Sequence, residues 1–185
     1  AASRGAPRQG GARRGKEPYA FRVPELPEMQ ALAERLTGFF AGATVTSVDV
    51  LGFSSLKTVV PGADTLIGRR VEQVGRRAKY LIFELDAAPE GDGAEDGPGR
   101  LLVHLSQAGR LDVEEPPKRT RPKGSTMRIG FDNGRAILVR EFGTERKAAW
   151  WVLAAGDDGP LEKLGPEPDS DEFAEVILHG TDKRR

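Results

Sequence analysis

The residues best suited to chemistry lie within 24–28, where two prolines and two carboxylates occur in five positions. A proline at the start of a chain carries a free secondary amine, which can attack an electrophilic carbon and form an iminium. A neighbouring carboxylic acid can transfer the protons that such a step requires. Pro24, Glu25 and Glu28 supply these groups. In a chain that keeps Ala1, however, Pro24 has an ordinary amide nitrogen.

The same segment also has a purely structural interpretation. Pro27 suits the first turn of a helix, and Glu28 lies near the positive end of the helix dipole. On composition alone, a stiff lead-in to a helix is the commoner explanation of such residues. The helix itself is predicted by apolar residues at helical spacing and by a glycine stop: Met29, Leu32, Ala33, Leu36, Phe40 and then Gly42.

The composition describes one globular domain with appendages. The chain has 185 residues, of which 38% are hydrophobic and 30% charged, enough to bury a core. No apolar run approaches the length that crosses a membrane, so no membrane partner is expected. The absence of cysteine excludes disulfides and thiolate metal sites within this chain, and two histidines leave little for a metal cluster. We therefore predict no metal site here.

The net charge of zero conceals segregated charge. Residues 1–22 hold six basic side chains and one acidic one, whereas residues 86–99 hold five acidic side chains and no basic one. A second basic run occupies 118–123, in a predicted loop. A polyanionic partner is therefore compatible with the neutral total.

The first 22 residues have no hydrophobic periodicity. They read either as a disordered basic arm that touches nucleic acid loosely or as a mis-assigned start. In the second case Val23 marks a GTG start codon read as valine. The sequence leaves both explanations open.

The rest of the chain alternates short β-prone segments with turns. Asp132-Asn133-Gly134 indicates a hairpin, because Asn-Gly suits a type I′ turn. The acidic stretch 86–99 predicts a long loop, and a final helix is expected from Asp169 or Ser170 to Leu178. The pattern predicts an eight-stranded antiparallel β-sandwich flanked by helices. The expected strands are 44–51, 69–74, 79–85, 101–106, 110–113, 126–131, 135–139 and 147–153.

Other polar residues are ambiguous when taken singly. Lys79, at the start of a predicted strand, is more often an edge-strand lysine than a phosphate ligand. His104 lies in an apolar strand and is more often structural. Arg140, Arg146 and Lys147 near the two tryptophans could form a nucleic-acid face or be ordinary solvated charges. None of these decides the function.

Four short segments carry a more specific signal. They are Pro24-Glu25-Leu26-Pro27-Glu28, Arg77-Ala78-Lys79-Tyr80-Leu81, His104-Leu105-Ser106-Gln107-Ala108-Gly109 and Leu164-Gly165-Pro166-Glu167-Pro168. Each resembles a motif of the formamidopyrimidine-DNA glycosylase and endonuclease VIII family, and all four occur in the family's order. One motif would be weak evidence, but four in order across residues 24–168 identify the chain as a member.

The resemblance implies an enzyme of base-excision DNA repair. Such a bifunctional DNA glycosylase/AP lyase removes oxidised bases and then nicks the strand by β,δ-elimination. Pro24 would be the N-terminal nucleophile that attacks the sugar C1′ and forms a Schiff base. Glu25 would protonate the opening sugar, and Glu28 would be a supporting carboxylate. The implied partner is damaged double-stranded DNA, bound by a monomer that works in the cytoplasm at the nucleoid.

The resemblance also implies DNA contacts. Lys79 would bind the phosphate beside the lesion, and Gln107 and Arg146 would lie at DNA-binding positions. The family's wedge, which fills the gap left by a flipped base, often uses Met, Arg and Phe. The matching places here are Gln107, Arg146 and Ala148, a less bulky set, so the lesion preference stays open.

The sequence also differs from the family pattern before Pro24 and after Pro168, and these two differences determine the expected domain organisation. Residues 1–22 would be the arm or mis-assigned start, 23–168 the β-sandwich catalytic domain, and 169–185 a connector helix to a missing helix–two-turn–helix module. Zinc, which some members hold in a C-terminal finger, would belong to that missing part. A chain of residues 1–185 that keeps its first 23 residues is therefore expected to be inactive or weak.

Two other functions stay open at this stage. A non-enzymatic damaged-DNA-binding homologue with a blocked proline would draw its affinity from the basic arm. It would show salt-dependent binding that is insensitive to Pro24→Ala. A sandwich that serves as a protein-interaction module would show no DNA affinity.

Overall fold

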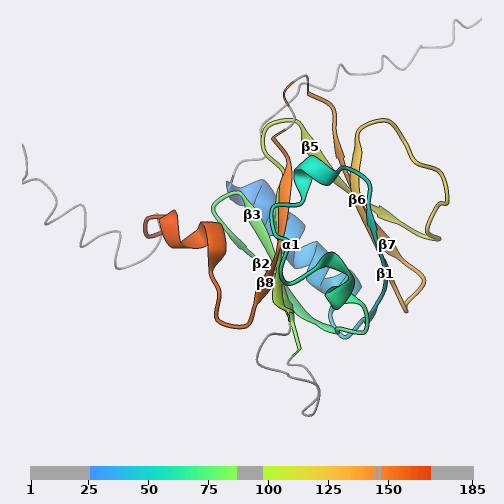
Figure 1. The fold of residues 1–185 in the computed structure, drawn as a ribbon, viewed down its shortest axis with the longest axis horizontal. Helices are drawn as coiled ribbons and strands as arrows, with labels where there is room; N and C mark the ends of the chain where they lie inside the picture. Colours follow the sequence, from blue (N-terminus) through green and yellow to red (C-terminus); the bar gives the residue numbers. More distant parts are fainter. Residues whose placement is uncertain (1–25, 87–97, 144, 146, 168–185) are drawn as a thin grey trace, which may run out of the picture.

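A computed structural model describes residues 26–86, 98–143, 145 and 147–167. Its described strands form two four-stranded antiparallel sheets that face each other (Figure 1). The first sheet has the order β1 (Val45–Val50), β6 (Ser125–Phe131), β7 (Ala136–Glu141) and β5 (Gly109–Glu114). The second has the order β2 (Val71–Arg77), β3 (Tyr80–Leu85), β4 (Pro98–His104) and β8 (Ala149–Ala154). The predicted eight-stranded antiparallel β-sandwich is confirmed.

Helix α1 (Leu26–Phe40) connects the two sheets. The Thr37 hydroxyl donates to the Val74 carbonyl in β2 at 2.9 Å, and the Phe40 ring lies 4.4 Å from the Phe131 ring at the end of β6. Gly42 follows the helix with a φ of 81°, a left-handed conformation that favours glycine. The predicted helix and its stop are therefore confirmed.

A single main core lies between the sheets and under α1. Its largest fully buried side chains come from the helix and from both sheets, so burial of each element depends on the others. Together they anchor the strands whose ends carry the polar residues described below. They include Met29, Leu36, Phe40, Phe83, Leu81, Met127, Ile129, Ile137 and Trp150.

The hairpin predicted at Asp132-Asn133-Gly134 joins β6 to β7, but its turn is not type I′. Gly134 has a positive φ of 76°, whereas Asn133 does not. The Asn133 amide instead donates to the Phe39 carbonyl at 2.8 Å, and its carbonyl oxygen accepts the Arg135 N–H at 3.2 Å. The turn is thus hydrogen-bonded to the end of α1.

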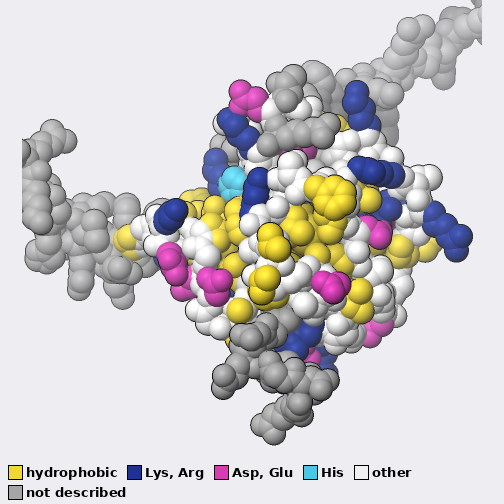
Figure 2. Space-filling model, viewed as in Figure 1, with side chains coloured by type: hydrophobic (Ala, Val, Ile, Leu, Met, Phe, Trp, Pro, Cys, Tyr) yellow, Lys and Arg dark blue, Asp and Glu magenta, His cyan; other side chains and the backbone are white. Residues whose placement is uncertain are grey.

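The chain between β1 and β2 forms two short 3₁₀ segments, η1 (Phe53–Ser55) and η2 (Ala63–Leu66). The Trp150 indole N–H donates to the Ser55 hydroxyl at 3.0 Å, which fixes η1 against β8. Hydrophobic side chains gather over these segments (Figure 2), and Phe53, Val59 and Val60 are each at least 84% exposed.

Another 3₁₀ segment, η4 (Gly159–Lys163), follows β8. No helix in the described ranges is long and apolar enough to cross a membrane. The arm 1–22 and the helix expected up to Leu178 lie outside the described residues.

Candidate nucleic-acid interface

Two loops lie side by side at one end of the sandwich. The turn after β4 contains Ser106, with a φ of 57°, and Gln107, which is exposed. The Phe142 N–H, after β7, donates to the Ala108 carbonyl at 3.2 Å. A Cβ at Gly143 would lie 2.9 Å from the Ala108 Cβ, so only glycine allows this approach. The contact places the backbone of Phe142 beside the Gln107 turn, and the half-exposed Phe142 ring lies under the Arg140 guanidinium, 4.9 Å from the ring centroid.

Lys79 lies in the turn between β2 and β3, not at the start of a strand as the sequence predicted. Ala78 and Lys79 form the turn, and Ala78 takes a φ of 50°. That conformation is uncommon for a residue with a Cβ. Because this turn lies at the end of the sheet, the exposed Lys79 lies outside the hydrogen-bonded pairing of β2 with β3, as a phosphate contact requires.

Glu167 holds this turn from the far end of the described chain. Its carboxylate accepts the Ala78 N–H at 2.7 Å and a hydrogen bond from the Arg76 guanidinium at 2.7 Å. Partial burial raises the pKa of Glu167, but the Ala78 amide and Arg76 outweigh it and hold this pKa below its usual value. The Leu164–Pro168 motif therefore acts on the Lys79 turn.

His104 is only partly buried and lies beside the Lys79 turn. It pairs with Tyr80 across the sheet, and the two rings are 4.8 Å apart. Burial lowers the pKa of His104 and the charge of Lys79 lowers it further, while a hydrogen bond with the Lys147 backbone opposes both. His104 thus belongs to the polar end of the sandwich, a role that its apolar sequence neighbours do not indicate.

The loop 142–148 is anchored by the carboxylate of Glu141. Glu141 Oε1 accepts the Lys147 N–H at 2.6 Å and the Ala148 N–H at 2.9 Å. Ala148 is only 4% exposed, so it is wrong as a wedge position. Phe142 is the exposed apolar side chain of this loop. No short sequence pattern indicates that Phe142 rather than Ala148 is exposed, because the burial of Ala148 accompanies the hydrogen bonds to Glu141, which a local pattern does not reveal.

A basic loop, residues 115–124, lies between β5 and β6. The buried Glu114 and Arg128 pair at 3.0 Å, and the Arg128 guanidinium also donates to the Thr120 carbonyl at 2.6 Å. The Glu114 carboxylate accepts the Lys118 N–H at 3.2 Å. The buried pair therefore fixes both the start and the middle of the basic loop.

The comparisons with known proteins agree with this arrangement. Residues 23–145 match the family described as "Formamidopyrimidine-DNA glycosylase N-terminal domain". The chain belongs to this family.

Formamidopyrimidine-DNA glycosylases of several bacteria are similar in sequence. That of Heliobacterium modesticaldum is 33% identical over 166 residues, which cover 83% of this chain and 54% of the relative. That of Bacillus subtilis is 31% identical over 165 residues, 84% of this chain and 54% of the relative. The chain thus spans about half the length of these curated relatives.

Solved structures of formamidopyrimidine-DNA glycosylases share the fold. The Lactococcus lactis enzyme, bound non-covalently to DNA with an AP site, superposes with a TM-score of 0.65 at 24% identity, over 83% of this chain and 55% of that one. MutM in complex with DNA containing carbocyclic 8-oxo-G gives a TM-score of 0.66 at 23% identity, over 84% and 54%.

Within the formamidopyrimidine-DNA glycosylase fold, the structure locates only some of the expected site residues. Glu28 is exposed in the first turn of α1, and Gln30 accepts a hydrogen bond from Arg76 at 3.2 Å, so this helix end lies near the end of β2 that carries Lys79. Pro24, Glu25 and Arg146 lie outside the described residues. The described ranges contain no cluster of three or more metal-ligating side chains.

Proposed function

We propose that this chain is the N-terminal catalytic domain of a bifunctional DNA glycosylase/AP lyase that removes oxidised bases in base-excision repair. One observation carries the proposal: the family match begins at residue 23, directly before Pro24, and α1 begins two residues after Pro24, at the Lys79 end of the sandwich. The similar structures with AP-site and 8-oxo-G DNA support damaged duplex DNA as the substrate class.

The proposed reaction uses the amine of Pro24. Its nitrogen attacks the sugar C1′, the bond from C1′ to the base breaks, and the base leaves with a proton. Glu25 protonates the ring oxygen as the bond from C1′ to that oxygen opens, which leaves an iminium at C1′. Glu28 supports the site as a second carboxylate. β,δ-Elimination then breaks the strand, and water releases Pro24 from the sugar fragment.

The proposed DNA contacts come from the polar end of the sandwich. Lys79 binds a backbone phosphate, and Gln107 and Arg146 contact the DNA on either side of the gap. Phe142 is an apolar group that can enter the base stack when a nucleotide leaves it. The target nucleotide must leave the base stack, because the Pro24 amine cannot reach its C1′ atom inside an intact duplex.

The proposed organisation retains the boundaries expected from the sequence. Residues 23–168 form the catalytic sandwich, 169–185 lead toward the second half that the relatives possess, and residues 1–23 block the amine of Pro24 while they are attached. Removal of residues 1–23 exposes the amine that the reaction requires.

The experiment is reductive trapping. Chains 1–185 and 24–185 are mixed with a duplex containing an abasic site and sodium cyanoborohydride, and the covalent adduct is mapped by mass spectrometry. We expect an adduct at Pro24 in chain 24–185 and none in chain 1–185. Chain 24–185 with an acetylated N-terminus is the matched control and should give none.

DNA binding by chain 24–185 without any adduct would overturn the proposed chemistry. It would favour a damaged-DNA-binding homologue that does not catalyse the reaction. Anisotropy measurements on the same duplex separate this outcome from a simple failure to bind.

A further inference from the structure

The loop after β1 presents an aromatic side chain to solvent. Phe53, in η1, is 86% exposed, whereas phenylalanine is among the residues most often buried. It belongs to neither hydrophobic cluster of the described residues. Val59 and Val60, further along the same loop, are exposed to a similar degree. The fold therefore does not account for Phe53, and an exposed apolar surface of this kind marks a site of interaction.

The backbone that carries Phe53 is fixed on both sides. The Ser55 hydroxyl donates to the Gly52 carbonyl at 2.5 Å and accepts the Trp150 indole N–H at 3.0 Å. The Gly52 N–H donates to the Thr126 carbonyl in β6 at 2.8 Å. The ring is thus presented from a loop that is hydrogen-bonded to both sheets, so a partner that binds it pays little for ordering the loop.

Two cations are held beside the ring by backbone carbonyls. The Arg121 guanidinium donates to the Leu51 carbonyl, and the Lys57 ammonium donates to the Ser54 carbonyl at 2.5 Å. These carbonyls lie before and after Phe53 in the chain. Both cations are exposed, and neither forms an ion pair with a carboxylate of the described residues. An exposed aromatic ring therefore lies between two uncompensated positive charges.

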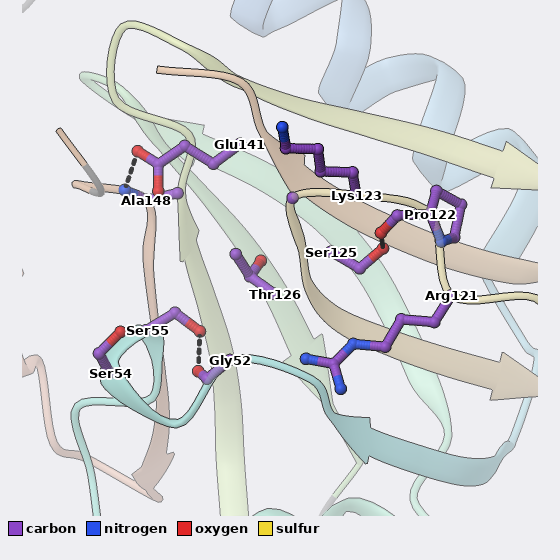
Figure 3. A pocket seen from close by; sticks show the side chains of 11 residues that line it. Gly52, Ser54, Ser55, Arg121, Pro122, Lys123, Ser125, Thr126, Glu141 and Ala148 are labelled. Atoms are coloured by element: carbon purple, nitrogen blue, oxygen red, sulfur yellow. Dashed lines mark hydrogen bonds between the residues drawn. The ribbon is translucent and has the colours of Figure 1, made fainter. Parts of the chain in front are cut away.

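A polar pocket of about 180 Å³ continues this positive surface between η1 and the segment before β6 (Figure 3). Ser54 lines one side, and Arg121 and Lys123 line the other, with Arg121 extending toward η1. Of the lining residues only Glu141 is acidic, and its buried carboxylate accepts backbone N–H groups of the loop 142–148. The exposed rim therefore carries positive charge.

This combination of ring and charges selects the partner. An apolar protein surface would cover Phe53 but would remove Lys57 and Arg121 from water without a counter-charge, which is costly. A polynucleotide supplies the face of a base for the ring and phosphates for the cations. A duplex keeps the faces of its bases inside its own stack, whereas a single strand exposes them.

We propose that the η1 loop binds single-stranded DNA, with a base stacked on the Phe53 ring and the neighbouring phosphates on Lys57 and Arg121. Stacking uses the face that every base possesses, so little sequence preference is expected.

The surface is continuous with the proposed DNA interface. Lys123 precedes Gly124, whose carbonyl accepts the Glu141 N–H at 2.8 Å, and Glu141 pairs with Gly109 directly after the Gln107 turn. A strand that leaves a duplex at the interface can therefore continue across η1. That continuity rests on the proposed function, whereas affinity for a free single strand does not.

The test titrates the full chain into a fluorescein-labelled oligothymidine, with fluorescence anisotropy as the readout. Phe53→Ala should weaken binding at least about fivefold, the lower end of what one base on an aromatic ring provides. Phe53→Trp should preserve the affinity, while Phe53→Leu, which keeps apolar area but has no ring, should behave like Phe53→Ala. Val59→Ala, an equally exposed position on the same loop, is the matched control and should change nothing.

The salt dependence tests the phosphate contacts. Lys57→Met should reduce the slope of log K against log salt by about 0.7, the value for one phosphate of a single strand. Lys163→Met removes an exposed lysine on η4 and should leave the slope unchanged. Wild-type affinity in Phe53→Ala, an equal loss in Val59→Ala, or an unchanged slope in Lys57→Met would each overturn the proposal. An apolar docking surface for a protein would give the second of these results.

A second arm identifies the source of the strand. A duplex with an abasic analogue is titrated with and without a single-stranded extension. Tighter binding of the extended duplex, lost in Phe53→Ala, assigns the surface to a strand continuous with the bound duplex. No gain from the extension, together with Phe53-dependent binding of the free oligothymidine, assigns it to a separate strand. Both results support the site even when no proline adduct forms, and failure of the free-strand titration overturns it even when the adduct does form.

Discussion

The carboxylate of Glu167 accepts the backbone N–H of Ala78 at 2.7 Å, across 89 positions of sequence. Ala78 has a φ of 50°, which a residue with a Cβ adopts at a cost of about 1 kcal/mol. The hydrogen bond to a charged acceptor offsets that cost and fixes the direction in which Lys79 leaves the turn. Glu167 is thus a positioning residue for the proposed phosphate contact.

We expect Glu167→Ala to lower the free energy of unfolding by about 1.5–3 kcal/mol, because hydrogen bonds to a charged group are lost at two donors. Urea denaturation measures this change. The same variant should weaken DNA binding, since Lys79 loses its fixed direction. Glu162→Ala, an exposed glutamate on η4, is the matched control and should change neither quantity by more than about 0.5 kcal/mol.

Acid should remove the contribution of Glu167. Its folded-state pKa lies below the ordinary value of 4.5, so the stabilisation is fully present above pH 4.5 and is lost as the pH falls through the lower folded-state pKa. The difference in stability between wild type and Glu167→Ala should therefore be constant above about pH 6 and shrink below pH 4.5. A difference that is unchanged down to pH 2.5 would show that the charge is irrelevant.

Much of the fold could be predicted because its signals are local. The spacing of Met29, Ala33, Leu36 and Phe40 predicts α1, and these residues are buried in it. All eight strand predictions overlap observed strands, because β-branched and apolar runs bounded by turn residues are distinctive.

The details that failed depend on distant partners. The sequence predicts a strand at Lys79 because Ala78 is not a typical turn residue, whereas in the structure the Ala78 N–H donates to the distant Glu167 carboxylate and Ala78 has a positive φ. Asn133 lacks the positive φ of a type I′ turn, and its amide donates to Phe39, a partner 94 positions away in the sequence. Ala148 is buried through its hydrogen bond to Glu141, and no short motif encodes that contact.

Removal of Lys79 should act on DNA affinity through charge alone. Lys79→Ala is expected to reduce the slope of log K against log salt by about one, with a uniform loss across DNA sequences. Fluorescence anisotropy with an abasic-analogue duplex at several salt concentrations gives the slope. Lys163→Ala removes an exposed lysine from η4 and should leave the slope unchanged. A sequence-dependent loss would argue against a phosphate contact.

DNA binding should take up a proton at His104. In the free protein, burial and the nearby Lys79 hold the pKa of His104 below 6.5. A phosphate on Lys79 reverses that charge effect, so the pKa rises on binding and affinity increases as the pH falls from about 7.5 to 5.5. His104→Gln should flatten this dependence, while His179→Gln, which removes the other histidine, should preserve it.

Among the ion pairs of the described residues, the buried pair of Glu114 and Arg128 should be the most sensitive to mutation. Both side chains are less than a tenth exposed, so Glu114→Ala leaves a buried guanidinium without its counter-charge. We expect a loss of about 3–5 kcal/mol in urea denaturation. Trypsin should also cut faster at Lys118 and Arg119, because the carboxylate no longer accepts the Lys118 N–H.

The neighbouring Glu115 provides the control for that loss. It pairs with Arg135 at 2.8 Å but is 59% exposed, so Glu115→Ala should cost less than about 1 kcal/mol. The double variant Glu114→Leu with Arg128→Met removes both buried charges and should recover most of the stability. It should not restore protection from trypsin, since the Thr120 and Lys118 backbone contacts need the polar pair. Equal losses for Glu114→Ala and Glu115→Ala would mean that water reaches the buried pair.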